Sequence, residues 1–482
     1  MDRPNIVIIT CHDAGCHFGC YGVPTVDTPN IDQLAAEGIR FTRMYATASM
    51  CSPSRGSLLT GQYPATHGLI GLAGRRYRWE LTDPKRHLSH QLRKAGYTTS
   101  LIGHQHETAD VSRLGFDHLA CLDSGQGSLQ QAHPIHDSSK AAYDYILSQA
   151  DADRPFYLQY GTHETHTPYD FDDCPPSDRL GTWIPPYCLV DDDDPEAEAL
   201  KKHIAGLQGS LRRLDRAVGT ILDALRLSGQ SENTLVIFTS DHGPELPRAK
   251  WTTYDAGSRV AFIARWPEKK LEGGRACNLL LSNVDVVPTL AEWLALDIDH
   301  AMEGRSFASA ITRKNAPPDA VRDAVYTAFM YNLNYGIRTL THSASMNFRG
   351  WYAGRPESEV PFFEAFNLKR DPYEQHNIAE LPSASATAHE LELWLWRHLE
   401  QTQDPVLLGD YGAPPYICGA PGERMPPCET HAEALRRYDR ASREMAPRKM
   451  PDEVSQNERA ALVRALGSNP TRITENEQES AR

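Results

Sequence analysis

The sequence predicts an α/β fold: a doubly wound, mostly parallel sheet with helices on both faces, plus a smaller C-terminal antiparallel-sheet subdomain. Short apolar runs rich in β-branched residues alternate with longer amphipathic stretches, which is the order of strands and crossover helices in a parallel sheet. The chain has 482 residues, of which 40% are hydrophobic, so it can bury one large core and a smaller one.

Four apolar runs are the predicted core strands, and polar residues follow each of them. The runs span residues 5–10, 98–102, 155–160 and 234–239. Just beyond them, in the same order, lie His12 and Asp13, His104 and His106, His163 and His166, and Asp241 and His242. Ligands of open α/β sheets bind at the C-terminal ends of the strands. We therefore expect these side chains to converge on one site.

Amphipathic stretches predict the helices that alternate with these strands. They span residues 31–37, 88–95, 138–150 and 197–227. This domain is predicted to occupy residues 1–318, because the connector that follows it contains Pro317 and Pro318.

A smaller α+β subdomain is predicted over residues 319–405. Its expected elements are short strands at 324–329, 335–340 and 362–368 and an amphipathic helix at 389–400 packed on their sheet.

Residues 406–482 form a tail rich in proline, glycine and charge, with helical patterns at 432–442 and 453–466. We expect the tail either to contact a second copy of the chain in a homo-oligomer or to end in disorder over 467–482.

Charge and hydropathy limit the partners. Lysine and arginine total 49 and aspartate and glutamate 63, a net charge of −14, which argues against nucleic acid because phosphate binding needs a basic face. No apolar run reaches the length of about 18 residues that a membrane span needs.

The N-terminus and the cysteines bear on the location of the protein. The N-terminus runs directly into the first strand, without a basic segment followed by an apolar leader, which favours a cytoplasmic protein. Ten cysteines without paired spacing favour reduced thiols, although their number leaves an extracellular or periplasmic home open.

Residues 51–55 carry the pattern Cys-x-Pro-x-Arg, which marks a cysteine that is oxidised to formylglycine. The aldehyde hydrate has two hydroxyls on one carbon, so one can attack a sulfate ester and the other can later expel the sulfate. Arg55 supplies a permanent cation beside Cys51. The alternative is a buried cysteine in a turn set by Pro53, followed by a serine-capped helix that starts near Gly56.

Several segments, in their order along the chain, resemble the formylglycine-dependent (type I) sulfatases of the alkaline phosphatase superfamily over roughly residues 4–405. They are residues 4–6 with Asp13, 19–22, 51–61, 96–99 with His106, 163–169, 240–243 with Lys250, 284–290 and 366–379. Residues 393–405 resemble the N-sulfoglucosamine sulfohydrolase branch of this family. The resemblance implies an alkaline phosphatase-like fold.

The resemblance also implies a divalent metal, because sulfate and the hydrate are both rich in negatively charged oxygens. Asp13, Asp241 and His242 match the ligands, and the oxidised Cys51 completes the shell. Ca²⁺ is the ion implied. The family usually has two adjacent aspartates where this chain has His12 and Asp13; a histidine ligand would admit Mn²⁺ or Zn²⁺ alongside Ca²⁺ or Mg²⁺. The alternative places His12 outside the shell as a core or supporting residue.

Catalytic roles follow from the same resemblance. Asp241 could deprotonate the attacking hydroxyl, and His166 or Lys250 could protonate the leaving group. His106 matches the base that releases sulfate, and Lys250 matches the sulfate-binding lysine. Arg55 is expected beside the hydrate.

His104 departs from the family, which usually has lysine at this place. We keep His104 as a candidate catalytic and substrate-binding residue, with Lys250 and His166, although an imidazole holds an anion only while it is protonated. For His163 we favour a structural role.

The resulting prediction is a hydrolase of a sulfate monoester or sulfamate, on a saccharide, whose maturation requires a formylglycine-generating enzyme. The alternative is a phosphonate monoester or phosphodiester hydrolase with the same nucleophile, and a non-catalytic binding protein is a third interpretation. Loops at 68–79, 171–195 and 332–356 are the expected pocket walls. Three arginines in the first of them (Arg75, Arg76 and Arg78) contact the saccharide or, as we favour, form a solvated turn.

Overall fold

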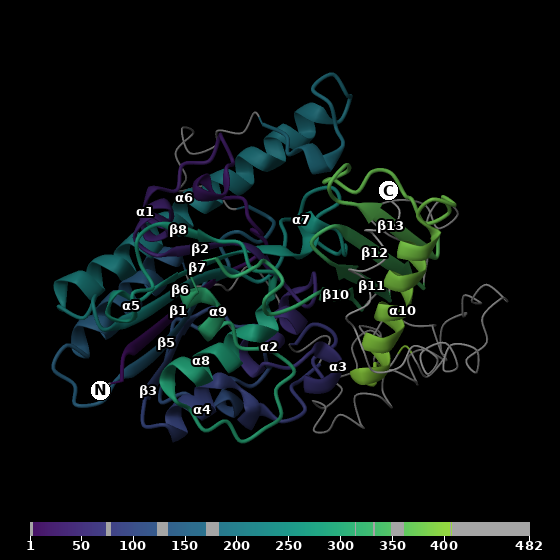
Figure 1. The fold of residues 1–482 in the computed structure, drawn as a ribbon. Helices are drawn as coiled ribbons and strands as arrows, with labels where there is room; N and C mark the ends of the chain where they lie inside the picture. Colours follow the sequence, from purple (N-terminus) through teal and green to yellow (C-terminus); the bar gives the residue numbers. More distant parts are fainter. Residues whose placement is uncertain are drawn as a thin grey trace, which may run out of the picture.

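The computed structural model describes residues 3–73, 79–122, 134–169, 183–313, 315–330, 333–348, 361–404 and 406. Within these ranges the chain forms one large mixed sheet flanked by helices and one small antiparallel sheet with its own helix (Figure 1). The predicted fold class is therefore confirmed.

The large sheet has nine strands among the described residues, in the order β4-β3-β5-β1-β6-β7-β2-β8, with β9 paired to β2. The strands are β1 (Asn5–Cys11), β2 (Ile39–Tyr45), β3 (Thr98–Gly103), β4 (His118–Ala120), β5 (Phe156–Gly161), β6 (Thr234–Ser240), β7 (Arg259–Arg265), β8 (Arg275–Cys277) and β9 (Leu281–Ser282). The four predicted strands are β1, β3, β5 and β6, which lie side by side and parallel. Only β7 among these nine runs antiparallel to its neighbours.

Helices cover both faces of this sheet, because consecutive strand residues are apolar and point to opposite sides. On β1, Val7 and Ile9 pack in one cluster, and Ile6 and Ile8 pack in the other. The first cluster takes residues from α1 (Pro29–Glu37), α5 (Ile135–Ser148) and α6 (Ala197–Leu227). The second takes residues from α2 (Cys51–Thr60), α4 (Leu88–Lys94), α8 (Val286–Leu294) and α9 (Ala308–Thr312). This part of the chain also contains two short helices, α3 (Pro64–His67) and α7 (Asp255–Ser258).

The small sheet has the strand order β10-β11-β12-β13 and is antiparallel throughout. Its elements are β10 (Val325–Phe329), β11 (Asn334–Arg338), β12 (His342–Asn347), β13 (Phe363–Asn367) and the covering helix α10 (Ser385–Gln401). Leu391 and Leu395 of α10 pack with Ile337 and Met346 of the sheet. Three of the strands and the helix match the predicted elements, whereas β12 was not expected.

The boundaries at residues 318 and 405 stay predictions. The tail, apart from residue 406, lies outside the described residues, and so do its two predicted helices. None of the described helices is long and apolar enough to cross a membrane. The described cysteines, Cys11, Cys16, Cys20, Cys51, Cys121, Cys188 and Cys277, are free thiols.

Asp404 carries a buried carboxyl group at the place where α10 meets the small sheet. Its Oδ1 accepts hydrogen bonds from the Tyr335 hydroxyl at 2.8 Å and from Val406 N at 3.0 Å. Burial raises the pKa of Asp404 from 3.8 to about 6. The folded state therefore holds this proton at a pH where the unfolded chain has lost it, so stability falls as pH rises through this window.

We expect Asp404→Asn to be about 2–3 kcal/mol more stable to unfolding than the parent near pH 8, and equally stable near pH 4, because the amide keeps the acceptor oxygen and carries no charge. Urea unfolding at the two pH values measures the difference. Asp223→Asn, at an exposed position on α6, is the matched control. Equal stability of parent and Asp404→Asn at both pH values would contradict the prediction.

Candidate functional site

Neighbouring parallel strands bring the predicted polar residues to one edge of the large sheet. Thr10 of β1 pairs with Gly161 of β5, and Cys11 pairs with Ser240 of β6. The segments that follow these strands therefore start at the same level and carry their side chains into one buried cluster.

Helix α2 supplies Cys51 to this cluster. The helix begins at Cys51 itself, with Met50 as N-cap, and not near Gly56 as the alternative interpretation had it. Pro53 occupies the first turn, where backbone N–H groups have no partner within the helix, so its missing N–H costs nothing. The Cys51 sulfur lies 3.3 Å from His242 Nε2 and 4.0 Å from Asp13 Oδ1.

Hydrogen bonds hold α2 against the segment that follows β6 and against Asn283, just before α8. The Ser54 hydroxyl donates a hydrogen bond of 2.5 Å to the backbone oxygen of Asp241, and Asn283 Nδ2 donates to the backbone oxygen of Ser54 at 3.0 Å. Cys51, one turn before Ser54, is thereby held against the strand end that carries Asp241.

Asp13 and Asp241 are both buried, with exposed fractions of 0% and 1%. Asp241 Oδ1 accepts hydrogen bonds from the backbone N–H of Asp13 at 2.9 Å and of His242 at 2.8 Å, and its Oδ2 accepts one from Arg55 Nε at 3.1 Å. Asp13 Oδ2 accepts a 2.5 Å hydrogen bond from Lys250 Nζ. Asp13 adopts the left-handed region at φ 44°, which is uncommon outside glycine.

His12 stands beside both carboxylates, within ion-pair distance of each. Its Nδ1 lies 3.0 Å from Asp241 Oδ2 and 3.6 Å from Asp13 Oδ1, yet no hydrogen bond from a described residue satisfies Nδ1 or Nε2, and both atoms are buried. Four possible metal ligands converge here, and their ligand atoms lie within 4.8 Å of one another. They come from His12, Asp13, Cys51 and Asp241. Two carboxylates, an imidazole and a sulfur that converge in this way fit a shared cation, so the residues present are compatible with a metal.

Charge in the cluster keeps the carboxyl groups ionised. Burial alone would raise the pKa of Asp13, but Lys250 and His242 hold it well below its usual range. The pKa of Asp241 is likewise lowered, since His242, His12 and Arg55 outweigh burial.

The same cluster shifts the sulfur and the imidazoles. Burial would raise the pKa of the Cys51 thiol, yet His12 and His242 lower it well below its usual value. Although burial opposes it, the Asp241 and Asp13 carboxylates raise the pKa of His242 to about 9. In the protein alone, Lys250, Arg55 and His242 thus compensate the two carboxylates.

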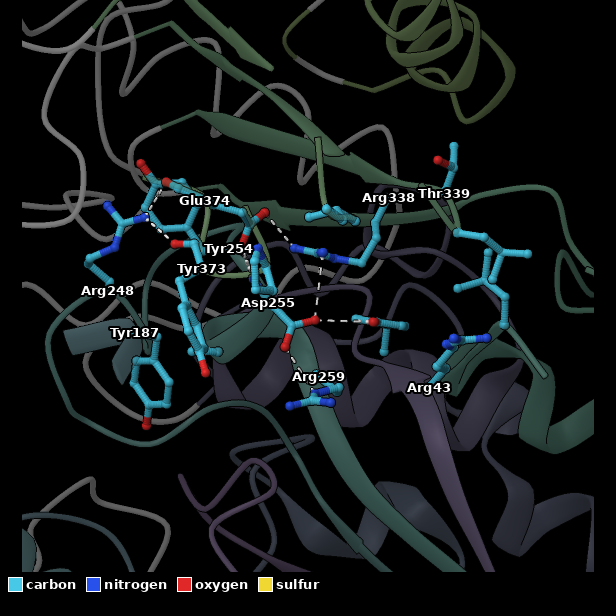
Figure 2. A pocket seen from close by; sticks show the side chains of 16 residues that line it. Arg43, Tyr187, Arg248, Tyr254, Asp255, Arg259, Arg338, Thr339, Tyr373 and Glu374 are labelled. Carbon is cyan, nitrogen blue, oxygen red and sulfur yellow. Dashed lines mark hydrogen bonds and ion pairs between the residues drawn. The ribbon is translucent and has the colours of Figure 1, made fainter. Parts of the chain in front are cut away.

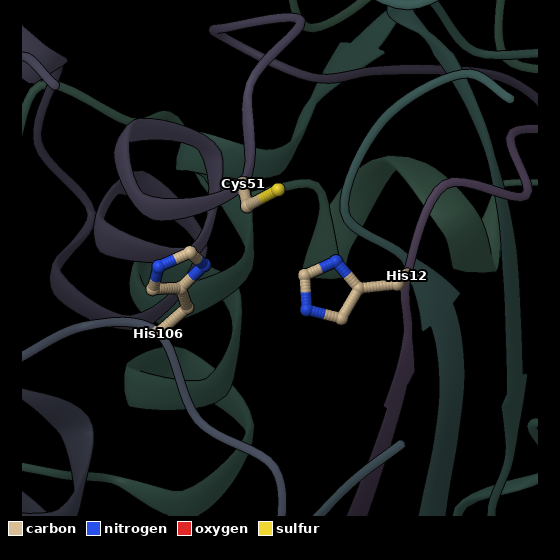
Figure 3. Close-up of side chains that lie close together, drawn as sticks. All are labelled: His12, Cys51 and His106. Atoms are coloured by element: carbon tan, nitrogen blue, oxygen red, sulfur yellow. The ribbon is translucent and has the colours of Figure 1, made fainter. Parts of the chain in front are cut away.

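His166 and His106 border the cluster. His166 Nδ1 lies 2.6 Å from the backbone oxygen of Thr167, so this nitrogen carries the proton and Nε2 faces Lys250 Nζ at 3.4 Å. His106 Nε2 lies 3.1 Å from the backbone oxygen of Ala73 and donates to it, which leaves Nδ1 as the basic atom. Figure 3 shows the rings of His106 and His12 on either side of Cys51.

His104 and His163 pack on His12, at centroid distances of 4.4 Å and 5.1 Å, and the three rings hold ligand nitrogens within 4.8 Å of one another. Burial, reinforced by His12, lowers the pKa of both His104 and His163 well below the usual value. His104 is therefore neutral near pH 7 and does not supply the positive charge of the lysine usual in the family. His163, for which we favoured a structural role, belongs to this group of histidines.

Two glutamates near the site were not singled out by sequence. Glu107 is buried, and its Oε2 accepts the backbone N–H of His106 at 3.2 Å. Glu245 accepts hydrogen bonds from Lys250 Nζ at 3.5 Å and from the Thr167 hydroxyl at 2.5 Å. The only signal in the sequence was that each lies within five residues of a candidate. The three arginines at 75, 76 and 78 lie outside the described residues.

Comparison with known proteins identifies the family. Residues 4–296 match the Sulfatase family, and residues 249–403 match the family described as N-sulphoglucosamine sulphohydrolase, C-terminal. The chain belongs to the sulfatase family. Its members hydrolyse sulfate esters, and this sulfatase is an enzyme of that class. The recognised resemblance is thereby confirmed.

Individual proteins that are similar in sequence are also sulfatases. Arylsulfatase A of Homo sapiens is 32% identical over 449 residues, 78% of this chain and 83% of the relative. N-sulphoglucosamine sulphohydrolase of Homo sapiens is 25% identical over 466 residues, 84% of this chain and 91% of the relative. Among solved structures, the phosphonate monoester hydrolase of Agrobacterium radiobacter shares the fold, with a TM-score of 0.63, 22% identity, and coverage of 83% of this chain and 96% of that one.

A chelator experiment tests the metal fit. We expect the parent protein to retain about one divalent ion per chain and to lose stability when EDTA removes it, because an ion bound only to the folded state adds about 2.7 kcal/mol at a hundred times its Kd. Asp13→Asn should retain no ion and should not respond to EDTA. Elemental analysis and thermal unfolding measure both effects.

The matched control is Asp299→Asn, at a position 55% exposed on the surface, which should bind metal like the parent. A parent protein that holds no divalent ion and is indifferent to EDTA would contradict the assignment of Asp13.

Proposed function

We propose that this sulfatase hydrolyses a sulfate ester or a sulfamate on a saccharide, with a formylglycine made from Cys51 as nucleophile and a divalent cation as cofactor. The observation that carries the proposal is the position of Cys51. Cys51 is the first residue of α2 and lies in a cluster of two ionised carboxylates and His242. Its sulfur lies 3.3 Å from His242 Nε2. A formylglycine-generating enzyme is the partner that this maturation requires.

Asp13, Asp241, His242 and the oxidised residue 51 would hold the cation, with His12 as a further ligand. The cation would supply positive charge for the sulfate oxygens. Two imidazole donors beside two carboxylates suit Mn²⁺ or Zn²⁺ as well as the Ca²⁺ or Mg²⁺ of an all-oxygen shell. Asp241 fits the ligand role better than that of a base, since its oxygens accept two backbone N–H groups and Arg55 and its pKa is held low.

Lys250 is the proposed anion-binding cation of the site. Burial lowers its pKa, but Asp13, Cys51 and Glu245 together raise it above its usual value, so the ammonium group stays charged. Its Nζ lies between Asp13 Oδ2 and His166 Nε2. From there Lys250 can hold a sulfate oxygen, and the Lys250–His166 pair can pass a proton to the leaving group.

His106 is the proposed base for sulfate release, because Nδ1 is its ring nitrogen without a described partner. Arg55 orients Asp241 through its Nε and stands one helical turn from Cys51. His104 remains a candidate substrate contact, but as a neutral imidazole it would donate or accept a hydrogen bond and would not attract the sulfate by charge.

A saccharide substrate is supported by the match to the N-sulphoglucosamine sulphohydrolase C-terminal family and by the relative of that name. The second candidate is a phosphonate monoester or phosphodiester hydrolase. Asp241 followed by His242 favours it, because hydrolases of that kind pair aspartate with histidine at the metal.

Three substrates separate these candidates. We expect turnover of an aryl sulfate and of N-sulfated glucosamine, and much slower turnover of an aryl phosphonate, measured as kcat/KM on protein produced together with a formylglycine-generating enzyme. A preference for the phosphonate by orders of magnitude would replace the first proposal with the second. Peptide mass analysis should show loss of sulfur at Cys51 but not at Cys11, a buried thiol in β1.

Lys250→Met tests the anion-binding role. The substitution keeps the side-chain length and removes the charge, so we expect kcat/KM for the aryl sulfate to fall by about 10²–10³. Lys140→Met, at an exposed position on α5, is the control and should retain parental activity. Parental kinetics for Lys250→Met would exclude Lys250 from the reaction.

A further inference from the structure

A pocket of about 380 Å³ lies between the large sheet and the small sheet, and none of its lining residues is a candidate catalytic or metal-binding residue (Figure 2). The large domain contributes Arg43 from β2 and Arg259 from β7, and the small sheet contributes Arg338 from β11. A fourth arginine, Arg248, comes from the segment between β6 and α7. The pocket has the size of a small-ligand site.

Both carboxylates of the pocket are already satisfied. Asp255 lies 3.0 Å from Arg259 Nε and 3.6 Å from Arg338 Nη1, and it accepts the Tyr45 hydroxyl at 3.1 Å. Glu374 accepts Arg338 Nη2 at 2.5 Å and the backbone N–H of Asp255 at 2.7 Å. Asp255 and Glu374 thus balance two arginines, Arg259 and Arg338.

The other two arginines donate hydrogen bonds only to neutral oxygens among the described residues. Arg248 Nη2 donates to the backbone oxygens of Tyr373 at 3.0 Å and Glu374 at 2.6 Å, and Arg43 Nη1 donates to the backbone oxygen of Asn278 at 3.2 Å. With four arginines and two carboxylates in its lining, the pocket therefore carries an excess of positive charge, in a chain of net charge −14.

Aromatic rings line the same wall as Arg248. Figure 2 shows Tyr254 and Tyr373 near its guanidinium, which lies 4.1 Å from the centroid of the Tyr254 ring, and Tyr187 also lines the pocket. Tyrosine presents an apolar face with a polar tip, and arginine binds sulfate or carboxylate groups through paired N–H donors. These two chemistries together match a sugar ring that carries an anionic group.

We propose that this pocket binds an anionic saccharide unit, a sulfated or carboxylated sugar, away from the group that is hydrolysed. The inference rests on the proposed saccharide substrate. One segment links the two places: Arg248 lines the pocket, and Lys250, two residues later, bonds to Asp13. A longer saccharide could therefore be held at a second point while its sulfate group occupies the site around Cys51.

Binding to a chain that cannot turn over tests the proposal. In a Cys51→Ser background, a heparin-derived tetrasaccharide is titrated by calorimetry against the otherwise unchanged chain and against Arg43→Gln/Arg248→Gln. We expect the double substitution to weaken affinity by about tenfold or more, because each arginine removed is a charge-assisted partner. Arg226→Gln, at an exposed arginine on α6, is the matched control and should bind like the background.

Further arms distinguish a saccharide held in this pocket from one held at the catalytic site and from an anion bound by charge alone. Unchanged binding by the double variant, with loss only in Lys250→Met, would place the saccharide at the catalytic site alone and overturn the proposal. Inorganic sulfate that binds the pocket as tightly as the tetrasaccharide, or a fully desulfated and carboxyl-reduced tetrasaccharide that binds equally well, would also overturn it. The single variant Arg43→Gln, whose side chain bonds only to one surface carbonyl among the described residues, serves if the double variant fails to fold.

Because binding is measured without turnover, its result is independent of the kinetic test of the proposed function. Failure to hydrolyse any sulfate ester would refute the proposed function and leave the pocket measurement valid. Absence of tetrasaccharide binding to the Cys51→Ser chain, when the parent chain hydrolyses N-sulfated glucosamine, would refute only the pocket.

Discussion

The burial of two ionised carboxylates, Asp13 and Asp241, is the constraint on which this site depends. An isolated buried carboxylate is costly, and two of them side by side repel each other, so the fold must supply compensating charge. Lys250 and Arg55 each bond to one carboxylate, and two backbone N–H groups donate to the other oxygen of Asp241. The convergence of carboxylate oxygens with His12 and Cys51 is what makes the cluster a place for a cation and for an anion bound to that cation.

The large sheet determines the relative positions of the charged side chains in the site. Because β1, β5 and β6 are adjacent and parallel, their ends lie level, and short segments suffice to bring Asp13, His166 and Asp241 together. Helix α2 is then locked to Asp241 through the Ser54 hydroxyl, so the position of Cys51 follows from the position of the carboxylate. Preorganisation of this kind places the nucleophile before substrate arrives, which is the usual source of electrostatic catalysis.

Much of the fold could be predicted because its central strands are apolar on both faces and its helices are amphipathic. The start of α2 and strand β12 were missed for physical reasons. Pro53 suggested a turn but sits where a helix needs no N–H, and β12 consists mainly of small polar residues. In the structure Ser343 bonds to Glu374 and Ser345 bonds to Thr253, so distant partners satisfy these hydroxyls and let a polar strand be buried.

The sequence by itself determined the chemistry of the site: a Cys-x-Pro-x-Arg nucleophile motif and aspartates and histidines after successive apolar runs, because residue type and order along the chain are local information. Only the tertiary structure decided which groups face one another. It turned His12 toward both carboxylates, buried His104 among other imidazoles so that its pKa is lowered, and brought arginines from β2, β7 and β11 to one pocket. These outcomes depend on burial and on contacts between residues hundreds of positions apart, and no local pattern encodes either.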